Sequence, residues 1–166
     1  MQGQKLDRID LKILATLQRF GRITNVELAE AVHLSPSPCL ARVKRLEKLG
    51  FISGYRAQID LQKLGKFLTV FTEVTLSEHH REDFARFEKR ISRIDEILEC
   101  HLVSGGYDYL LKFITSSVAR YQELIEEMLQ DDGLGIDKYF SYIVIKSPFI
   151  KQYQPIEALL VDDHDS

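Results

Sequence analysis

Apolar positions near the N-terminus recur every three or four residues, which is the spacing of an amphipathic helix. One such stripe covers residues 6–20, and Gly21 directly after it is expected to end the helix. A second helix is predicted to begin at Thr24, because Thr24 and Glu27 have the spacing of a capping box, in which each side chain satisfies a backbone N–H at the helix start. The chain is therefore expected to open with two short helices.

A third helix follows, and its two sides differ in chemistry. Ser35 is expected to cap it, Pro36 fits the first helical position because the N–H there has no helical partner, and Gly50 is expected to end it. The apolar side carries Cys39, Val43 and Leu46. The opposite side is small near its start and basic further on, with Ser37, Ala41, Lys44, Arg45 and Lys48.

A helix with one buried apolar side and one basic side can lie in the major groove of DNA, where lysines and arginines reach phosphates. Three short helices with a tight connection at residues 33–34 favour a helix-turn-helix over the alternative, an ordinary solvated basic face. The residues expected near base edges or adjacent phosphates are Ser35, Ser37, Arg42 and Arg45, and those expected on the DNA backbone are Arg22, Lys44, Lys48 and Arg56.

The segment after the third helix is expected to form a small wing or connector. Residues 51–59 have the pattern of two short strands around a turn at residues 53–54. Residues 60–66 would then link this part to the rest of the chain. The predicted winged helix-turn-helix domain accordingly spans residues 6–67.

Beyond this domain the hydrophobic pattern switches between the two-residue period of strands and the period of helices. Strands are predicted over residues 67–76, 97–103, 107–114 and 138–147, and helices over 80–93 and 118–128. The order β-α-β-β-α-β is that of the ferredoxin-like fold, in which two helices cover one face of a four-stranded antiparallel sheet. We therefore predict an α+β chain, with a ferredoxin-like domain over residues 68–155 and a flexible acidic tail over 156–166.

In the second domain, apolar side chains occupy both faces of the predicted sheet, although the two helices can cover only one of them. In the strand predicted over residues 97–103, Leu98, Cys100 and Leu102 point one way while Ile97 and Val103 point the other, so neither side is polar. A second copy of the chain that laid its own sheet against the uncovered face would bury these side chains. We therefore expect at least a homodimer.

Charge and cysteine content sharpen this picture. The net charge is −3, but residues 1–60 hold ten Lys/Arg and six Asp/Glu, a net charge of +4, whereas the remainder carries −7. This asymmetry favours a polyanionic partner for the first part alone. The two cysteines form no disulfide framework, no apolar run is long enough to span a membrane, and the start lacks a secretory signal. We therefore expect a cytoplasmic protein.

The sequence shows no motif for catalysis or metal binding. His79, His80 and His101 lack metal-ligand spacing with other histidines or cysteines. Cys39 and Cys100 occupy apolar helix and strand positions, which favours structural burial over redox chemistry. Phosphate loops, nucleophile elbows and paired catalytic carboxylates are not found. We expect no enzyme, no metal site and no cofactor.

Two long motifs lie in a fixed order along the chain. The first combines Leu-Asp-Arg-Ile-Asp at residues 6–10 with Asn25-Val-Glu-Leu-Ala and with Leu-Ser-Pro-Ser-Pro-Cys-Leu at residues 34–40. The second is Glu-Cys-His-Leu-Val-Ser-Gly-Gly-Tyr-Asp-Tyr at residues 99–109. Both resemble the leucine-responsive regulatory protein (Lrp/AsnC) family of transcription regulators. The resemblance extends from about residue 6 to about residue 155, and it adds Asn25 to the expected DNA-binding residues.

The resemblance implies a regulator, often of amino-acid metabolism, that forms homodimers through its second domain and assembles further into tetramers, octamers or larger rings. It also implies an amino-acid effector, bound between dimers beside the turn at residues 105–109. The expected effector-binding residues are Leu102, Gly105, Gly106, Tyr107, Asp108, Tyr109 and Tyr142. Many relatives carry an acidic residue where this chain has Gly106, which leaves the identity of the effector open.

The residues of the turn fit such a site. Two adjacent glycines let a ligand approach the backbone closely, and Asp108 could accept a charge-assisted hydrogen bond from the ammonium group of an amino acid. The alternative is an ordinary hairpin turn that happens to contain an aspartate.

We therefore predict a sequence-specific DNA-binding regulator whose partners are double-stranded DNA, an amino-acid effector and further copies of itself. Two other functions stay open. One is an architectural DNA-wrapping protein without an effector. The other is an allosteric amino-acid-binding subunit of an enzyme, which the basic third helix disfavours.

Overall fold

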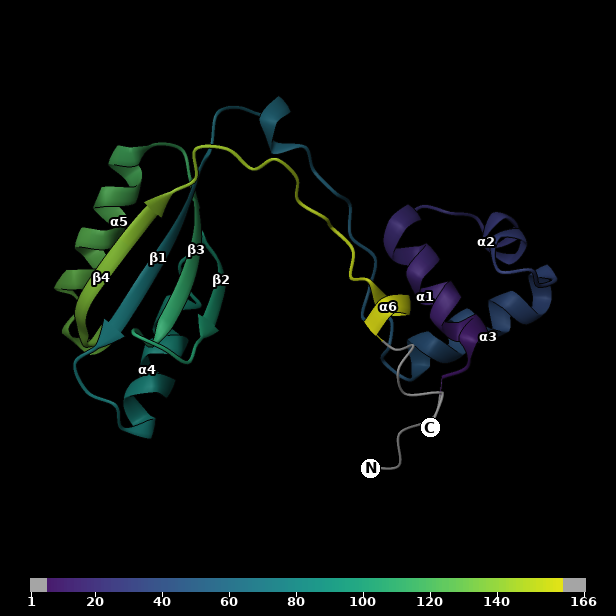
Figure 1. Cartoon of the computed structure of the whole chain (residues 1–166), viewed down its shortest axis with the longest axis horizontal. Helices are drawn as coiled ribbons and strands as arrows, with labels where there is room; N and C mark the ends of the chain where they lie inside the picture. The colour runs from purple at the N-terminus through teal and green to yellow at the C-terminus, as the bar shows by residue number, and fades with distance from the viewer. Residues whose placement is uncertain (1–5, 160–166) are drawn as a thin grey trace. The chain divides into compact units, whose positions relative to one another are not determined.

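The computed structural model describes residues 6–159 and divides them into two compact units (Figure 1). The first unit comprises residues 6–59 together with residues 149–159, and the second comprises residues 60–148. The chain therefore passes from the first unit to the second and back again. Among the described helices, none is both long and apolar enough to cross a membrane.

The first unit contains the predicted helices, α1 (Arg8–Phe20), α2 (Asn25–Ala31) and α3 (Pro36–Lys48). Asp7 caps α1 by accepting a hydrogen bond from the backbone N–H of Asp10 at 2.8 Å. Thr24 and Glu27 form the predicted capping box of α2, with the Thr24 N–H donating to the Glu27 carboxylate at 2.8 Å. The tight turn before α3 contains His33 in the left-handed region, at φ 59°.

The core of the first unit lies between these helices. Its buried side chains are Ile13, Leu28, Ala29, Val32, Cys39, Val43 and Leu46. The predicted apolar side of α3 is therefore confirmed. Phe20 and Val26 also follow the apolar pattern, but they are mostly exposed and lie outside this core.

The wing prediction is wrong in one respect, because residues 51–59 are extended but form no strand within the described chain. A two-stranded ribbon of this length has little stability by itself, since it buries almost no apolar surface. Tyr55 and Ile59 are accordingly more than half exposed.

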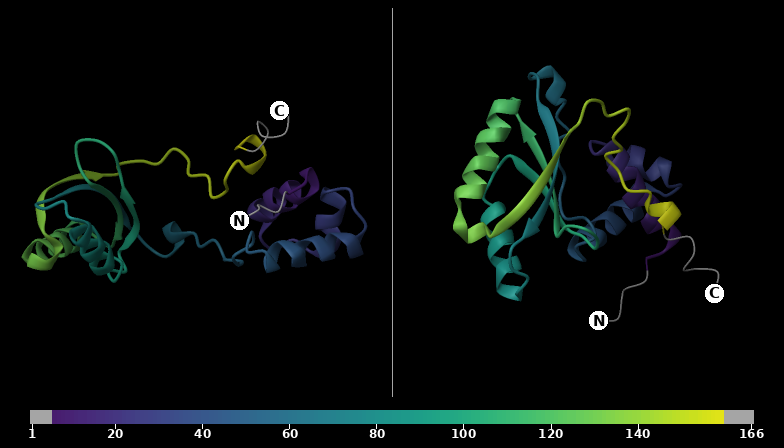
Figure 2. Two further views of the ribbon diagram at one scale, coloured as in Figure 1. Left: turned by 90° about the horizontal axis from the view of Figure 1, so that it is seen from below. Right: turned by 60° about the vertical axis from the view of Figure 1, so that its left-hand side comes forward.

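Residues 149–159, which we call the return segment, pack against α1. Gln18 and Gln154 exchange two hydrogen bonds, from the Gln154 N–H to the Gln18 side chain at 2.9 Å and from the Gln18 amide to the Gln154 carbonyl at 3.4 Å. The short helix α6 (Ile156–Leu159) lies beside α1 in Figures 1 and 2. The division into compact units thus differs from the predicted boundary at residue 155, because residues 149–159 belong with the first unit. The predicted domain bounds and the predicted flexible tail over residues 156–166 stay predictions. Residues 160–166 of that tail lie outside the described residues.

The second unit is the predicted ferredoxin-like fold. Its elements are β1 (Leu68–Leu76), α4 (Arg81–Ile91), β2 (Ile97–Leu102), β3 (Tyr109–Thr115), α5 (Val118–Gln130) and β4 (Ile136–Ile143). The antiparallel sheet has the order β2-β3-β1-β4. Both α4 and α5 cover the same face of it (Figure 2).

Alternate residues of the two central strands point at these helices and form the core. The largest buried rings are Phe87, Tyr109, Phe113 and Tyr121. Tyr121 keeps its hydroxyl satisfied among apolar neighbours by hydrogen bonding to Thr72 at 2.8 Å and to Ser141.

The other face of the sheet has no helix over it and carries large apolar side chains, as the alternation predicts. Phe71, Leu110 and Ile114 are partly buried there, while Phe140 is 60% and Tyr142 53% exposed. An uncovered apolar face of this kind is typical of a subunit interface.

Candidate DNA-binding face and effector turn

An ion-pair cluster holds α3 against the start of α1. Arg42 donates to Asp7 at 2.6 Å and to Asp10 at 2.9 Å, and Arg45 pairs with the other oxygen of Asp10. The Asp10 side chain is only 1% exposed, and its carboxylate oxygens accept from the two arginines and from the N–H of Asp7. Partial burial raises the pKa of Asp7, but hydrogen bonds from the backbone of Asp10 and from Arg42 outweigh it and hold that pKa below its usual value.

This cluster changes the expected roles of two arginines. The sequence predicts Arg42 and Arg45 near base edges or adjacent phosphates, and the structure also pairs both guanidinium groups with aspartates at the start of α1. Arg42 is 29% and Arg45 42% exposed, so part of each stays on the surface. The two arginines therefore orient α3 before any partner arrives. Sequence reasoning missed this because the aspartates and the arginines lie 32 or 35 positions apart in the chain.

The rest of the predicted face of α3 is open. Its exposed side chains are Ser35, Ser37, Ala41, Lys44 and Lys48. Ser35 occupies the cap position but makes no capping hydrogen bond, and Pro38, at the third helical position, has no N–H to donate to its hydroxyl. The start of α3 therefore presents hydroxyl groups, and its later turns present two lysines.

The other predicted DNA-binding residues lie outside α3. Asn25 ties the start of α2 to the start of α3 by donating to the Pro36 carbonyl at 2.9 Å, and its own side-chain oxygen is buried without a partner in the described chain. Arg22 and Arg56 come together beside the end of α1, where both line one hollow.

The predicted effector turn, residues 105–109, lies in the connection between β2 and β3 and ends at the first residue of β3. Gly105 has φ 152°, a conformation that other residues rarely adopt. The Asp108 carboxylate accepts the N–H of Leu76 at 2.8 Å, and both its oxygens lie 3.1 Å from Nε2 of His79. Asp108 therefore fastens the turn to the end of β1, so an ammonium group would have to share or replace these partners.

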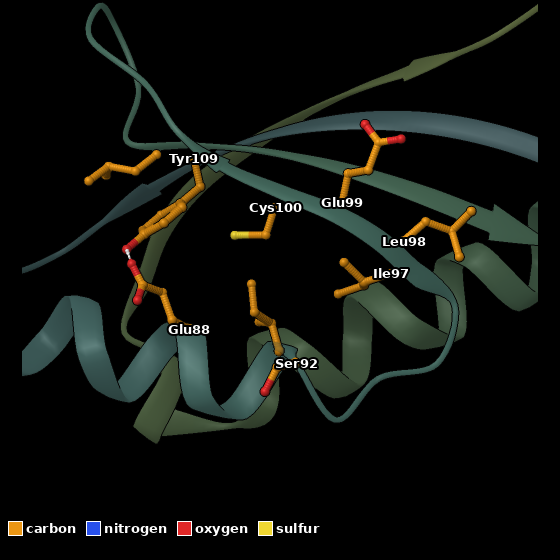
Figure 3. Close-up of a pocket in the computed structure, with 9 residues that line it drawn as sticks. Glu88, Ser92, Ile97, Leu98, Glu99, Cys100 and Tyr109 are labelled. Carbon is orange, nitrogen blue, oxygen red and sulfur yellow. Dashed lines mark hydrogen bonds between the residues drawn. The ribbon is translucent and has the colours of Figure 1, made fainter. Parts of the chain in front are cut away.

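A groove of about 560 Å³ lies next to this turn, between α4 and β2 (Figure 3). Apolar side chains line most of it, including Ile91, Leu98 and Leu102. The ring of Tyr109 belongs to the core, and its hydroxyl donates to Glu88 at 2.8 Å at the groove wall.

The Cys100 thiol also faces this groove. Partial burial, together with the Glu88 carboxylate, raises its pKa to about 11, which keeps the thiol protonated near neutral pH. Within residues 6–159, no cluster of three or more histidine, cysteine or carboxylate side chains could hold a metal ion.

The predicted effector residues do not all meet within one chain. Leu102 pairs with Tyr109 on the helix-covered face of the sheet. Tyr142 pairs with Phe71 on the uncovered face, where its hydroxyl donates to Glu73 at 3.1 Å. Gly106 and Tyr107 lie on the turn itself, and both are accessible.

A helix-turn-helix unit with an exposed basic face, joined to a ferredoxin-like unit with an accessible turn, is the architecture of a transcription regulator that has a DNA-binding and a ligand-binding domain. Comparison with known families agrees, because residues 6–53 match a winged helix-turn-helix DNA-binding domain and residues 69–153 match the Lrp/AsnC ligand-binding domain. The chain belongs to the Lrp/AsnC family of transcription regulators.

Individual relatives cover nearly the whole chain. The transcriptional regulatory protein DoeX of Halomonas elongata is 48% identical over 159 residues, which is 96% of this chain and 98% of that protein. The leucine-responsive regulatory protein of Escherichia coli is 49% identical over 144 residues, or 87% of each chain.

Solved structures share the fold. A transcriptional regulator of Neisseria meningitidis, in complex with L-methionine, superposes with a TM-score of 0.85 at 33% identity, covering 94% of this chain and all of that one. An AsnC family regulator of Agrobacterium tumefaciens gives a TM-score of 0.86 at 29% identity, covering 93% of this chain and all of that one.

Proposed function

We propose that this protein binds specific DNA sequences through α3 and adjusts transcription in response to an amino acid, with genes of amino-acid metabolism as its targets. The observation that carries the proposal is the division of α3 into a buried apolar side and an exposed side with hydroxyl groups at its start and lysines further on. Such a helix can place its first turn against base edges while its lysines contact phosphates.

The DNA-binding part is tested with duplexes that the full-length protein selects from a random library. Lys44→Gln and Lys48→Gln should each weaken binding and lower the slope of log affinity against log salt by about 0.9, the value expected for one lost phosphate contact. Ser37→Ala should instead change which sequences are selected. Unaltered affinity, slope and selected sequence in all three variants would remove α3 from the interface.

The effector part rests on the open turn, on the groove beside it, and on the relative that was solved with L-methionine. A bound effector stabilises the folded protein by mass action, so thermal unfolding in the presence of each of the twenty amino acids should reveal a rise in melting temperature. No rise with any of them, combined with normal DNA binding, would favour an architectural protein. A rise without DNA binding would favour an enzyme's allosteric subunit.

Asp108 is tested by Asp108→Asn, because asparagine can still accept the N–H of Leu76 while the negative charge is lost. We expect DNA binding to persist and the effector response to disappear. Asp95→Asn, which removes the same charge from an exposed position in the same unit, serves as a control that should leave the response to the amino acid unchanged.

For assembly, we propose a homodimer formed through the uncovered face of the sheet, which associates further into higher homo-oligomers. The exposed rings of Phe140 and Tyr142 on that face support this arrangement. Sedimentation of Phe140→Lys should shift the distribution toward smaller species, since a buried unpaired charge opposes association.

A further inference from the structure

Three arginines surround one hollow of about 820 Å³ at the end of α1 in the first unit. Arg19 lies in the last turn of α1, Arg22 follows it, and Arg56 comes from the extended segment after α3. The glutamines 18, 58 and 152 also line the hollow and add amide donors. All three arginines are exposed, so the hollow is open to solvent.

These guanidinium groups lack acidic partners. Among the described side chains, no carboxylate lies within 4.0 Å of Arg19, Arg22 or Arg56, whereas Arg42 and Arg45 in the same unit are paired with aspartates. The carbonyl end of α1 favours a cation in its last turn and so accounts for Arg19. It does not account for the two arginines gathered beside it.

The return segment forms part of this hollow. Gln152 lines it, and the ring of Tyr153 lies 4.9 Å below the guanidinium carbon of Arg19, which is the geometry of a cation–π contact. The exchange of hydrogen bonds between Gln18 and Gln154 fixes this segment on α1. A ring on one side of Arg19 leaves the planar edge of its guanidinium free to donate paired hydrogen bonds.

The hollow also adjoins α3. Tyr55 lines it, and the Tyr55 hydroxyl donates to Glu47 on α3 at 2.9 Å. This bond occupies the nearest carboxylate of that helix. Cationic side chains in the hollow are therefore part of the same rigid unit as the recognition face.

The sequence already predicts DNA-backbone contacts for Arg22 and Arg56. We propose that Arg19 and the return segment join them in one hollow that binds phosphates beside the segment read by α3, so that the return segment is part of the DNA-binding surface. Unpaired guanidinium groups recognise phosphate oxygens with paired hydrogen bonds. The hollow is open and is lined by three chain segments. Such a surface suits a sugar–phosphate strand better than it suits a small molecule, which usually binds in an enclosed pocket. The inference rests on the proposed function, since it requires that the protein binds DNA.

The test measures binding of the full-length protein to its selected duplex and to a random duplex between 50 and 250 mM KCl. We expect Arg19→Gln and Arg56→Gln each to weaken binding to both duplexes by the same factor, about fivefold, and to lower the salt slope by about 0.9. Equal losses on both duplexes distinguish a backbone contact from base reading. Tyr153→Leu should weaken binding by about twofold, because Arg19 keeps its charge but loses its platform.

Arg93→Gln is the matched control, because Arg93 is exposed in the second unit and its loss removes the same charge from the same chain. It should leave affinity and slope unchanged. Thermal melting of every variant shows whether the fold is preserved. Inorganic phosphate, compared with chloride at equal ionic strength, tests for a site that takes a free anion.

If Arg19→Gln and Arg56→Gln kept the wild-type salt slope, or if Arg93→Gln lost as much affinity as they do, the hollow would not be a phosphate site. The proposed function would still stand. Phosphate that stabilises the wild type but not Arg56→Gln, with DNA slopes unchanged, would assign the hollow to a small anion instead. Failure of the wild type to bind any duplex would defeat both the hollow and the proposed function.

Discussion

The two units of this chain are stabilised internally by different interactions. In the second unit, stacked layers of aromatic and aliphatic side chains between sheet and helices form one continuous core. In the first, smaller unit, a modest apolar core is supplemented by a buried aspartate that pairs with two arginines of α3. A small unit buries too little surface to rely on apolar packing alone.

This difference matters for function. An ion pair is directional, so the cluster of Asp10, Arg42 and Arg45 sets the orientation of α3, while leaving its serines and lysines uncommitted. The core of the second unit is less directional, but it is complete on one side of the sheet only. The first unit therefore uses polar interactions to orient one helix, and the second unit leaves one apolar face of its sheet exposed.

The largest expected effect comes from the core of the second unit. Phe113→Ala should destabilise the protein by about 4 kcal/mol, because it removes a fully buried ring and leaves a cavity. Urea unfolding measures the loss. The neighbouring change Ile114→Ala lies on the uncovered face of the same strand and should affect association more than unfolding. Equal losses in the two variants would mean that the two faces are buried alike.

The next largest effect concerns the ion-pair cluster. Asp10→Asn should destabilise the first unit by about 3 kcal/mol, because two arginines lose the charge that holds them. Asp7→Ala should cost only about 1 kcal/mol, since Asp7 is half exposed and acts mainly as a helix cap. Urea unfolding followed by helix content compares them. A loss in Asp10→Asn no greater than in Asp7→Ala would show that the cluster adds little beyond the cap.

A smaller effect is expected from acid. The pKa of Glu96 lies below its usual value, mainly because Arg120 donates hydrogen bonds to its carboxylate. Because the folded-state pKa is depressed, this pair stabilises the protein above the unfolded pKa of about 4.3 and the contribution disappears as pH falls through the folded pKa. Both side chains are partly exposed, so we expect about 0.5 kcal/mol.

Unfolding at pH 7 and below pH 4 in the wild type and in Glu96→Gln measures this contribution. The difference in stability between the two proteins should shrink on acidification. A constant difference would mean that the charge of Glu96 is not what the pair depends on.

The smallest effect is predicted at the effector turn. Gly106→Asp should change stability by less than about 0.5 kcal/mol, because a Cβ atom there would meet no atom within 4 Å. Gly105→Asp should cost about 1 kcal/mol or more, since its φ of 152° is strained for other residues. Thermal melting separates the two. The response of Gly106→Asp to amino acids would then report on effector choice without a change in folding.

Most of the fold follows from local signals in the sequence. The capping box at Thr24 and Glu27, the apolar side of α3 and the alternating strands each depend on residues close together in the chain, and all are confirmed. The strands predicted at residues 51–59 fail because an extended pattern says nothing about whether a pairing partner is present.

The features that sequence reasoning missed depend on contacts between distant residues. Asp10 and Arg45 are 35 positions apart, and no spacing rule pairs them until the helices are packed. Gln18 and Gln154 are 136 positions apart, so no local pattern predicts that residue 154 packs against the first helix. At the predicted effector site, the register places Leu102 and Tyr142 on opposite faces of the sheet, which a list of motif residues does not reveal.

The double crossing between units makes the ferredoxin-like unit an insertion within the DNA-binding unit. The ferredoxin-like unit is therefore joined to its host by two chain segments rather than one. The same topology offers two natural seams, near residues 60 and 148, at which one sensor could be exchanged for another without cutting through either core.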